Sequence, residues 1–278
     1  MEAAAGLGVT CWLVTGGGGM LASDLVRVLD GAEVRAPTRA ELDITDVSAV
    51  SEAVDWADVV VNCAAWTAVD DAETNEEAAL RVNAPHALAE RAGRKLVHLS
   101  TDYVFSGEGA EPWPEDAPTG PINAYGRTKL AGEQVVLAHH GTVVRTAWLY
   151  GAHGPNFVRT MARLERSHEV VTVVDDQHGQ PTWTHDLARR IVDLVGSGAR
   201  GVFHGTNSGA TTWHGLAQEV FRLLGADPAR VRPVASDAFP RPAPRPKNSV
   251  LAHGAWASAG LKPMRDWREA LHEAWPEL

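Results

Sequence analysis

Cysteine is scarce in this chain of 278 residues, and its scarcity excludes several classes of protein. Only Cys11 and Cys63 are present, without a CxxC pair or the cysteine–histidine spacing of a zinc site. Both lie in apolar runs, so we predict two small core residues in neighbouring strands. No disulfide framework is expected, which fits a reducing cytoplasm.

Long apolar runs and excess positive charge are missing too. No apolar run approaches the ~18 residues of a membrane span, and residues Met1 to Ala5 lack the basic region of a secretory signal. The formal net charge of -10 opposes binding to nucleic-acid phosphates. We therefore expect a cytoplasmic protein with no membrane or nucleic-acid partner. A small anionic ligand would need local cations.

The chain does contain short apolar strands that alternate with helical patterns over residues 1–150. Strands are expected at 10–15, 33–36, 58–65, 95–99 and 141–146, and helices at 20–29, 46–53 and 75–92. This alternation predicts an α/β fold with a doubly wound, Rossmann-like parallel sheet. We expect the dinucleotide-binding domain at 1–150, completed by about 184–205. Residues 151–183 and 206–278 would form a smaller, discontinuous α+β region that binds substrate.

A glycine cluster separates the first predicted strand from the first predicted helix. Its pattern, Gly16-x-x-Gly19-x-x-Ala22, permits a tight turn and lets backbone approach a pyrophosphate at the helix N-terminus. NAD-preferring proteins place an acid after the second strand, but residues 36–39 contain none and offer Arg39. NADPH is thus favoured over NADH, with a solvated loop arginine as the alternative. Asp43 could reach the adenine amine or only stabilise a turn.

Three further side chains suggest carbonyl chemistry. Thr101 follows an apolar strand, and the spacing of Tyr125 and Lys129 places both on one face of a helix. Tyr125 could protonate a carbonyl oxygen while a cofactor delivers hydride, and Thr101 could donate a hydrogen bond to that oxygen. We expect the charge of Lys129 to lower the Tyr125 pKa from its ordinary ~10.

These residues resemble the dTDP-4-dehydrorhamnose reductase family of extended short-chain dehydrogenases/reductases. The matching stretches follow one another over nearly the whole chain: 61–70, 100–105, 125–133, 145–151, 156–158, 175–182 and 245–249. The resemblance implies NAD(P)H-dependent reduction of the C4 ketone of a nucleotide-linked 4-keto-6-deoxyhexose. The implied reaction converts dTDP-4-dehydro-L-rhamnose to dTDP-L-rhamnose.

The resemblance also implies roles for individual residues. The catalytic residues would be Thr101, Tyr125 and Lys129. The cofactor would be lined by Gly16, Gly19, Met20, Leu21, Asp43, Ile44, Ala64, Ala65 and Thr67. The residues facing sugar or nucleotide would be Thr101, Asp102, Val104, Trp148, Asn156 and Arg245.

The chemistry of several side chains also suggests, independently of the resemblance, how a nucleotide-linked substrate could be bound. Trp148 could stack on a ring, with buried packing as the alternative. Arg241, Arg245 and Lys247 could pair with a diphosphate, or form a solvated basic loop.

A magnesium-linked dimer held by acidic residues is known in the resembled family. Its nearest candidates here are Asp24 and Asp186, with Glu273 and Glu277 as further acids near the end of the sequence. Both Asp24 and Asp186 are aspartates where glutamate is expected, so no metal ligand is assigned, Mg2+ stays open, and monomer and homodimer are both retained.

Other functions stay open at this point. The same chemistry could serve another dTDP-4-keto sugar of an antibiotic-type pathway, such as a dihydrostreptose precursor. A non-catalytic, NADP-binding regulatory subunit, like that of methionine adenosyltransferase, would keep the fold, but Thr101, Tyr125 and Lys129 are intact. Epimerase and dehydratase chemistry use the same fold, but a dehydratase should carry a second acid where Tyr103 follows Asp102.

Overall fold

The structure is a computed structural model that describes residues 10–278, so the prediction about Met1 to Ala5 lies outside the described residues. Its centre is a six-stranded sheet of parallel strands in the order β10-β5-β4-β3-β1-β2. The strands are β1 (Cys11–Thr15), β2 (Glu33–Arg35), β3 (Val59–Asn62), β4 (Leu96–Thr101), β5 (Thr142–Thr146) and β10 (Val202–His204). The predicted doubly wound α/β fold is confirmed.

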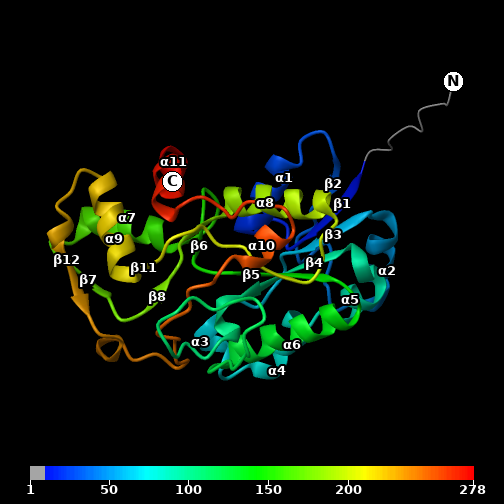
Figure 1. The fold of residues 1–278 in the computed structure, drawn as a ribbon, viewed down its shortest axis with the longest axis horizontal. Helices are drawn as coiled ribbons and strands as arrows, with labels where there is room; N and C mark the ends of the chain where they lie inside the picture. The colour runs from blue at the N-terminus through cyan, green and yellow to red at the C-terminus, as the bar shows by residue number, and fades with distance from the viewer. Residues whose placement is uncertain (1–9) are drawn as a thin grey trace.

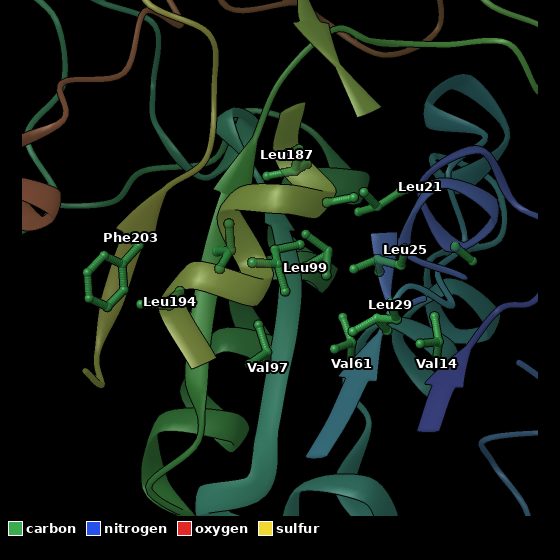
Figure 2. Close-up of a cluster of buried hydrophobic side chains, with 14 of the residues drawn as sticks. Val14, Leu21, Leu25, Leu29, Val61, Val97, Leu99, Leu187, Leu194 and Phe203 are labelled. Atoms are coloured by element: carbon green, nitrogen blue, oxygen red, sulfur yellow. The ribbon is translucent and has the colours of Figure 1, made fainter. Parts of the chain in front are cut away.

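Helices cover both faces of this sheet (Figure 1). One face carries α1 (Met20–Val28), α8 (Thr184–Ser197) and α10 (Gly254–Ser258); the other carries α2 (Val47–Trp56), α4 (Glu76–Asn83), α5 (His86–Ala92) and α6 (Ala124–Ala138). Successive strand residues alternate between the two cores. Val14 packs with Leu25 and Leu187 in the core of Figure 2, whereas Leu13 packs in the core on the opposite face. Packing of helices on both faces thus holds the sheet in place. The carboxyl ends of its strands carry the candidate active site described below.

A second, smaller lobe packs beside the sheet (Figure 1, left). It contains α7 (Phe157–Ser167), β7 (Val171–Val174), α9 (Trp213–Leu223), β12 (Val231–Val234) and α11 (Trp267–Ala274). Short pieces complete it and the connections: β6 (Leu149–Tyr150), β8 (His178–Gly179), β9 (Thr182–Trp183), β11 (Thr211–Thr212), α3 (Val69–Ala72), η1 (Gly93–Lys95), η2 (Asp102–Val104), η3 (Pro228–Arg230), η4 (Ser236–Ala238) and η5 (Trp275–Glu277). Parallel β7 and β12 and helix α9 share an apolar core of their own.

One local prediction turns out differently. The helix expected over 75–92 is wrong as one element, since α4 ends at Asn83 and α5 begins at His86. Pro85 between them lacks an N–H and restricts the preceding residue, which breaks the helix. Helix α2 is capped by Asp46, whose carboxylate accepts from Ser48 N and Ala49 N.

Both cysteines are partly accessible, so the prediction that they are simply core residues is incomplete. Cys63 packs against the core of Figure 2, yet it also lines the cavity described below. Within residues 10–278, none of the helices has the length and apolar character that crossing a membrane requires.

Candidate active site

A cavity of about 450 Å3 opens at the carboxyl ends of β1 and β3. The strand order reverses there, because β2 lies on one side of β1 and β3 on the other. Open α/β sheets bind ligands at this position. The cofactor residues predicted from the sequence all line the cavity: Gly16, Gly19, Met20, Leu21, Arg39, Asp43, Ile44, Ala64, Ala65, Thr67, Tyr125 and Lys129.

The glycine loop shapes one wall of this cavity. Gly17 N donates to the Pro37 carbonyl at 2.8 Å, and a Cβ on Gly17 would lie 1.9 Å from the Ala36 carbonyl oxygen. Only glycine permits this approach between the loop and the segment after β2. Helix α1 begins at Met20, and the preceding Gly19 provides no side-chain cap, so the first N–H groups of the helix are available to an anion. The loop therefore fits the pyrophosphate of a dinucleotide.

Arg39 and Asp43 line the same cavity, and they follow the Ala36–Pro37 segment that Gly17 contacts. Asp43 accepts from Thr45 N at 2.9 Å and from Thr45 Oγ1 at 2.8 Å, which confirms its turn-stabilising role. These bonds, with a smaller contribution from the charge of Arg39, lower the Asp43 pKa. The carboxylate of nearby Glu41 accepts a hydrogen bond from Thr38 N at 2.8 Å. A cationic group thus lies after β2, where a ribose 2′-phosphate would be read.

The predicted catalytic residues meet where α6 packs on the end of β4 (Leu96–Thr101). Asn123 caps α6 by accepting from Gly126 N at 2.8 Å, which places Tyr125 in the first turn. A Cβ on Gly126 would lie 2.2 Å from the Tyr103 carbonyl oxygen, so glycine lets the helix approach η2. The Tyr125 phenol is hydrogen-bonded to the buried Thr101 side chain.

Burial dominates the proton affinities of the pair on α6. It raises the Tyr125 pKa to about 12, although the bond to Thr101 lowers it. Burial also lowers the Lys129 pKa to about 8. Lys129 Nζ donates to the Leu99 carbonyl at 2.6 Å, and its charge has no resolved effect on the Tyr125 pKa. The predicted lowering of the Tyr125 pKa by Lys129 is therefore wrong in this structure, because desolvation of the phenol prevails.

Asp102, the residue after Thr101, is 2% exposed. Its Oδ1 accepts from Thr101 Oγ1 at 2.9 Å, while its Oδ2 makes no hydrogen bond to residues 10–278. Burial raises the Asp102 pKa to about 6, partly offset by the Ser249 and Thr101 hydroxyls. A buried carboxylate oxygen without a partner is costly, so it marks a place where a polar ligand group would be stabilising.

A second cavity of about 540 Å3 lies against the smaller lobe. Its aromatic lining comes from Tyr103, Phe157, Trp213 and Phe239. Trp148 stacks on Trp213 with ring centroids 3.6 Å apart and planes at 11°. Trp213 lines the second cavity, whereas Trp148 itself lines neither cavity, although Leu149 next to it in the chain lines the first. Trp213 was not predicted as a site residue, because an apolar residue in a helical pattern indicates packing rather than the wall of a ligand site.

The proline-rich segment 236–248 runs from the smaller lobe back toward α3, as Figure 1 shows. Arg241 and Arg245 from this segment line the second cavity, and both pair with Asp70 of α3. Arg245 Nη1 donates to Asp70 Oδ1 at 2.9 Å, and this bond is the main cause of the lowered Asp70 pKa. Lys247, also predicted to face a diphosphate, is exposed and does not line either of these two cavities. Asp70 was not predicted from the sequence.

Two predicted substrate residues make structural contacts instead. Val104 is completely buried in an apolar cluster with Phe105 and Leu251. The Asn156 side chain caps α7 and donates to the Gly151 carbonyl at 3.0 Å. Neither residue lines the two cavities described, and their contact with a sugar stays a prediction.

The acids considered for a shared magnesium ion are paired within this chain. Arg27 pairs with Glu277 at 2.9 Å, and Arg265 pairs with Asp186 at 2.8 Å and also with Glu273. Asp24 is buried and accepts from Thr184 Oγ1. Residues 10–278 contain no group of three or more side chains arranged to hold a metal ion. Within one chain, these acids do not fit a magnesium site.

The chain was compared with known proteins. Residues 11–278 match the family model described as RmlD substrate binding domain. A "dTDP-4-keto-6-deoxy-D-glucose reductase" of Streptomyces niveus is 56% identical, over 96% of this chain and 97% of its own length. A "dTDP-4-dehydrorhamnose reductase" of Streptomyces griseus is 55% identical, over 96% and 93%. The structure of the Bacillus anthracis dTDP-4-dehydrorhamnose reductase in complex with NADP has a TM-score of 0.93 and 36% identity, over 97% of this chain and 100% of that one.

These matches cover nearly all of the chain. The chain belongs to the RmlD substrate binding domain family, which confirms the predicted resemblance to dTDP-4-dehydrorhamnose reductases.

Proposed function

We propose that this protein uses NADPH to reduce the C4 ketone of a nucleotide-linked 4-keto-6-deoxyhexose. The observation that carries the proposal is the position of Tyr125 between the two cavities. Its side chain lines the first cavity, and its ring contacts Tyr103, which lines the second, with centroids 5.9 Å apart. A cofactor in the first cavity and a sugar reaching from the second would meet at this phenol.

The chain's own residues supply the proton chemistry. Bound NADPH would supply the hydride, since no side chain can donate one. Tyr125 donates its proton to the ketone oxygen. The Thr101 hydroxyl, whose single proton is directed to Asp102 Oδ1 in this structure, turns that proton to the ketone oxygen as charge develops. The raised pKa of about 12 keeps Tyr125 protonated at neutral pH, which suits reduction. The free Oδ2 of Asp102 accepts a hydrogen bond from a sugar hydroxyl.

We assign the nucleotide to the second cavity. The flat base would lie among aromatic side chains such as Phe157 and Trp213. Arg245, helped by Arg241, would pair with the diphosphate and supply the local positive charge that an acidic protein needs. Trp148 would then face the sugar between the two cavities, and Asn156 would lie at the rim beside Met20.

The first candidate substrate is dTDP-4-dehydro-L-rhamnose, with dTDP-L-rhamnose as the product. A second candidate is another dTDP-4-keto-6-deoxy sugar, because relatives named for two different substrates are 56% and 55% identical to this chain. A purely regulatory, NADP-binding role is disfavoured, since Tyr125 and Lys129 line the cofactor cavity and the Thr101 side chain meets the Tyr125 phenol.

A panel of ketosugars tests the function. Purified protein is incubated with each dTDP-linked 4-keto-6-deoxyhexose and with NADPH or NADH, nicotinamide absorbance is followed, and products are identified by NMR. Cofactor oxidation with formation of a C4 alcohol is expected for at least one dTDP sugar. Absence of turnover with every dTDP sugar, while NADPH still binds, would overturn the proposal.

Arg39 should determine the preference for NADPH. Replacing Arg39 with alanine removes a charge-assisted contact with the 2′-phosphate, so KM for NADPH should rise about tenfold or more while KM for NADH stays nearly constant. Steady-state kinetics with both cofactors measures this. Arg94→Ala is the matched control, because Arg94 is exposed in η1 at the amino end of β4. Equal changes for NADPH and NADH would contradict the assignment.

Arg245 should contribute binding rather than chemistry. In Arg245→Ala, KM for the nucleotide sugar should rise about tenfold or more, with kcat changed less than about threefold, since the diphosphate contact is the same in the ground and transition states. Arg232→Ala is the control, because Arg232 is exposed on β12 and lines neither of the two cavities. An unchanged KM would remove Arg245 from the diphosphate site.

A further inference from the structure

A buried row of polar side chains leads from β3 to the catalytic helix α6. Asn62 Nδ2 lies 2.9 Å from His98 Nδ1, and His98 Nε2 lies 3.3 Å from Lys129 Nζ. Asn62 and His98 have no exposed surface, and Lys129 is 1% exposed. Water is therefore excluded from these contacts, so each donor must meet an acceptor within the row.

The direction of the hydrogen bonds is fixed at one end of the row. The backbone N–H of Ala64 can only donate, and it lies 3.2 Å from Asn62 Oδ1. The Thr15 hydroxyl, 2.5 Å from the same oxygen, can also donate. The Asn62 carbonyl oxygen must therefore face Ala64, which turns the Nδ2 donor toward His98. Nδ1 of His98 accepts, and the proton of the neutral ring is placed on Nε2.

We propose that His98 is a positioning residue that presents an Nε2–H donor to Lys129 Nζ and thereby favours the neutral amine over the ammonium. The neutral amine can accept this hydrogen bond while it donates to the Leu99 carbonyl at 2.6 Å. An ammonium has no lone pair and would face Nε2–H as donor against donor.

The electrostatics of the row agree with this geometry. Burial and the charge of Lys129 hold the His98 pKa well below its ordinary value, so the ring is neutral. Burial lowers the Lys129 pKa to about 8, while Glu133 of α6 and Cys63 after β3 act in the opposite direction. Tyr125, one turn earlier on α6, lines the cavity together with Lys129, and Arg39 and Asp43 line it as well.

Close packing of α6 builds the row. A Cβ on Gly132 would lie 2.1 Å from the Asn83 carbonyl oxygen and 3.2 Å from His98 Nε2. Glycine at this position lets α6 approach α4 and β4, which brings Lys129 Nζ within 3.3 Å of His98 Nε2. The donor on His98 and the amine are thus held by the same helix contact that places Tyr125.

The consequence for catalysis rests on the proposed function. After Tyr125 gives its proton to the ketone oxygen, Lys129 Nζ can return a proton to the phenolate, which leaves a neutral amine. The Nε2–H donor of His98, which points at Lys129 Nζ, makes the ammonium form less stable. The Lys129 pKa is thereby lowered toward neutral pH. His98 therefore sets the alkaline limit of reduction, since Lys129 must carry a proton to return one.

The proton position on His98 can be observed without substrate or cofactor. The 15N NMR spectrum of histidine-labelled protein distinguishes protonated from unprotonated ring nitrogens, and a His98→Gln sample assigns the His98 signals. We expect the proton on Nε2 and none on Nδ1. A proton on Nδ1, or on both nitrogens, would overturn the inference and would leave the proposed reductase function untouched.

The nearly isosteric substitution Asn62→Asp should reverse the direction of the hydrogen bonds in the row. In Asn62→Asp, the carboxylate accepts from Ala64 N–H and from His98 Nδ1–H, which leaves Nε2 as an acceptor for the Lys129 ammonium. The alkaline limb of kcat/KM for reduction, which reports the free enzyme, should move up by about one pH unit. The same substitution in a His98→Gln background keeps the new charge but lacks the imidazole. An equal shift in both backgrounds would assign the effect to charge alone and overturn the role of His98.

Discussion

Tyr125→Phe should lower kcat for ketosugar reduction by at least about 100-fold, because general-acid catalysis typically contributes a factor of about 10² to 10⁴. The phenylalanine ring keeps the edge contact with Tyr103 but cannot donate a proton to the ketone oxygen. Binding of NADPH should change little, since a single hydroxyl is lost from a large cavity. Stopped-flow measurement of NADPH oxidation with saturating substrate, together with NADPH titration, separates the two effects.

Tyr150→Phe provides the matched control. Tyr150 is buried in the core of the smaller lobe, and its hydroxyl has no hydrogen-bond partner among residues 10–278. Loss of this hydroxyl should leave kcat unchanged. Near-normal turnover of Tyr125→Phe would remove the phenol from the mechanism, and an equal loss in both variants would indicate a general packing defect.

Arg145→Met should lower the free energy of unfolding by about 3–5 kcal/mol, the cost of leaving one member of a buried ion pair uncompensated. Arg145 of β5 donates to both carboxylate oxygens of Glu133, at 2.9 Å and 2.8 Å, and both side chains are almost fully buried. Glu133 Oε1 also accepts from Ser100 at 2.5 Å. Methionine fills much of the volume but leaves the Glu133 charge buried without its partner. Urea denaturation followed by circular dichroism measures the loss.

The double variant Glu133→Gln/Arg145→Met distinguishes charge from packing. Removal of the carboxylate as well should restore much of the lost stability, because the unpaired charge is then absent. The exposed Arg81–Glu77 pair is the control, and Arg81→Met should leave the urea midpoint almost unchanged. An Arg145→Met variant as stable as the wild type would show that the buried pair does not stabilise the fold.

The parts of the site that depend on neighbouring residues in the chain could be predicted from the sequence. The glycine loop between β1 and α1, and the spacing of Tyr125 and Lys129, are local patterns whose geometry follows from strand and helix periodicity. Thr101 could be placed because parallel strands end at a common edge of the sheet. Pro85 was a signal available in the sequence, and it would have divided the helix expected over 75–92.

The remainder depends on contacts between distant segments. Trp213 meets Trp148 only because the smaller lobe folds back on the sheet, and Asp70 of α3 meets Arg245 of the distant proline-rich segment. His98 resembles an ordinary strand residue until α6 brings Lys129 onto it. The Tyr125 pKa was expected to fall because its spacing from Lys129 was visible, whereas the desolvation that raises it is a property of the assembled core.

The central claim is that hydride passes from the cofactor to C4 of a nucleotide-bound ketosugar beside Tyr125. The most direct measurement uses NADPH deuterated at nicotinamide C4, on the transferred face, with a dTDP-4-keto-6-deoxyhexose, followed by NMR of the product. The account predicts one deuterium at C4 of a 6-deoxyhexose product from the wild type, and almost no labelled product from Tyr125→Phe. A reduced sugar without deuterium at C4, or with deuterium at another carbon, would contradict it.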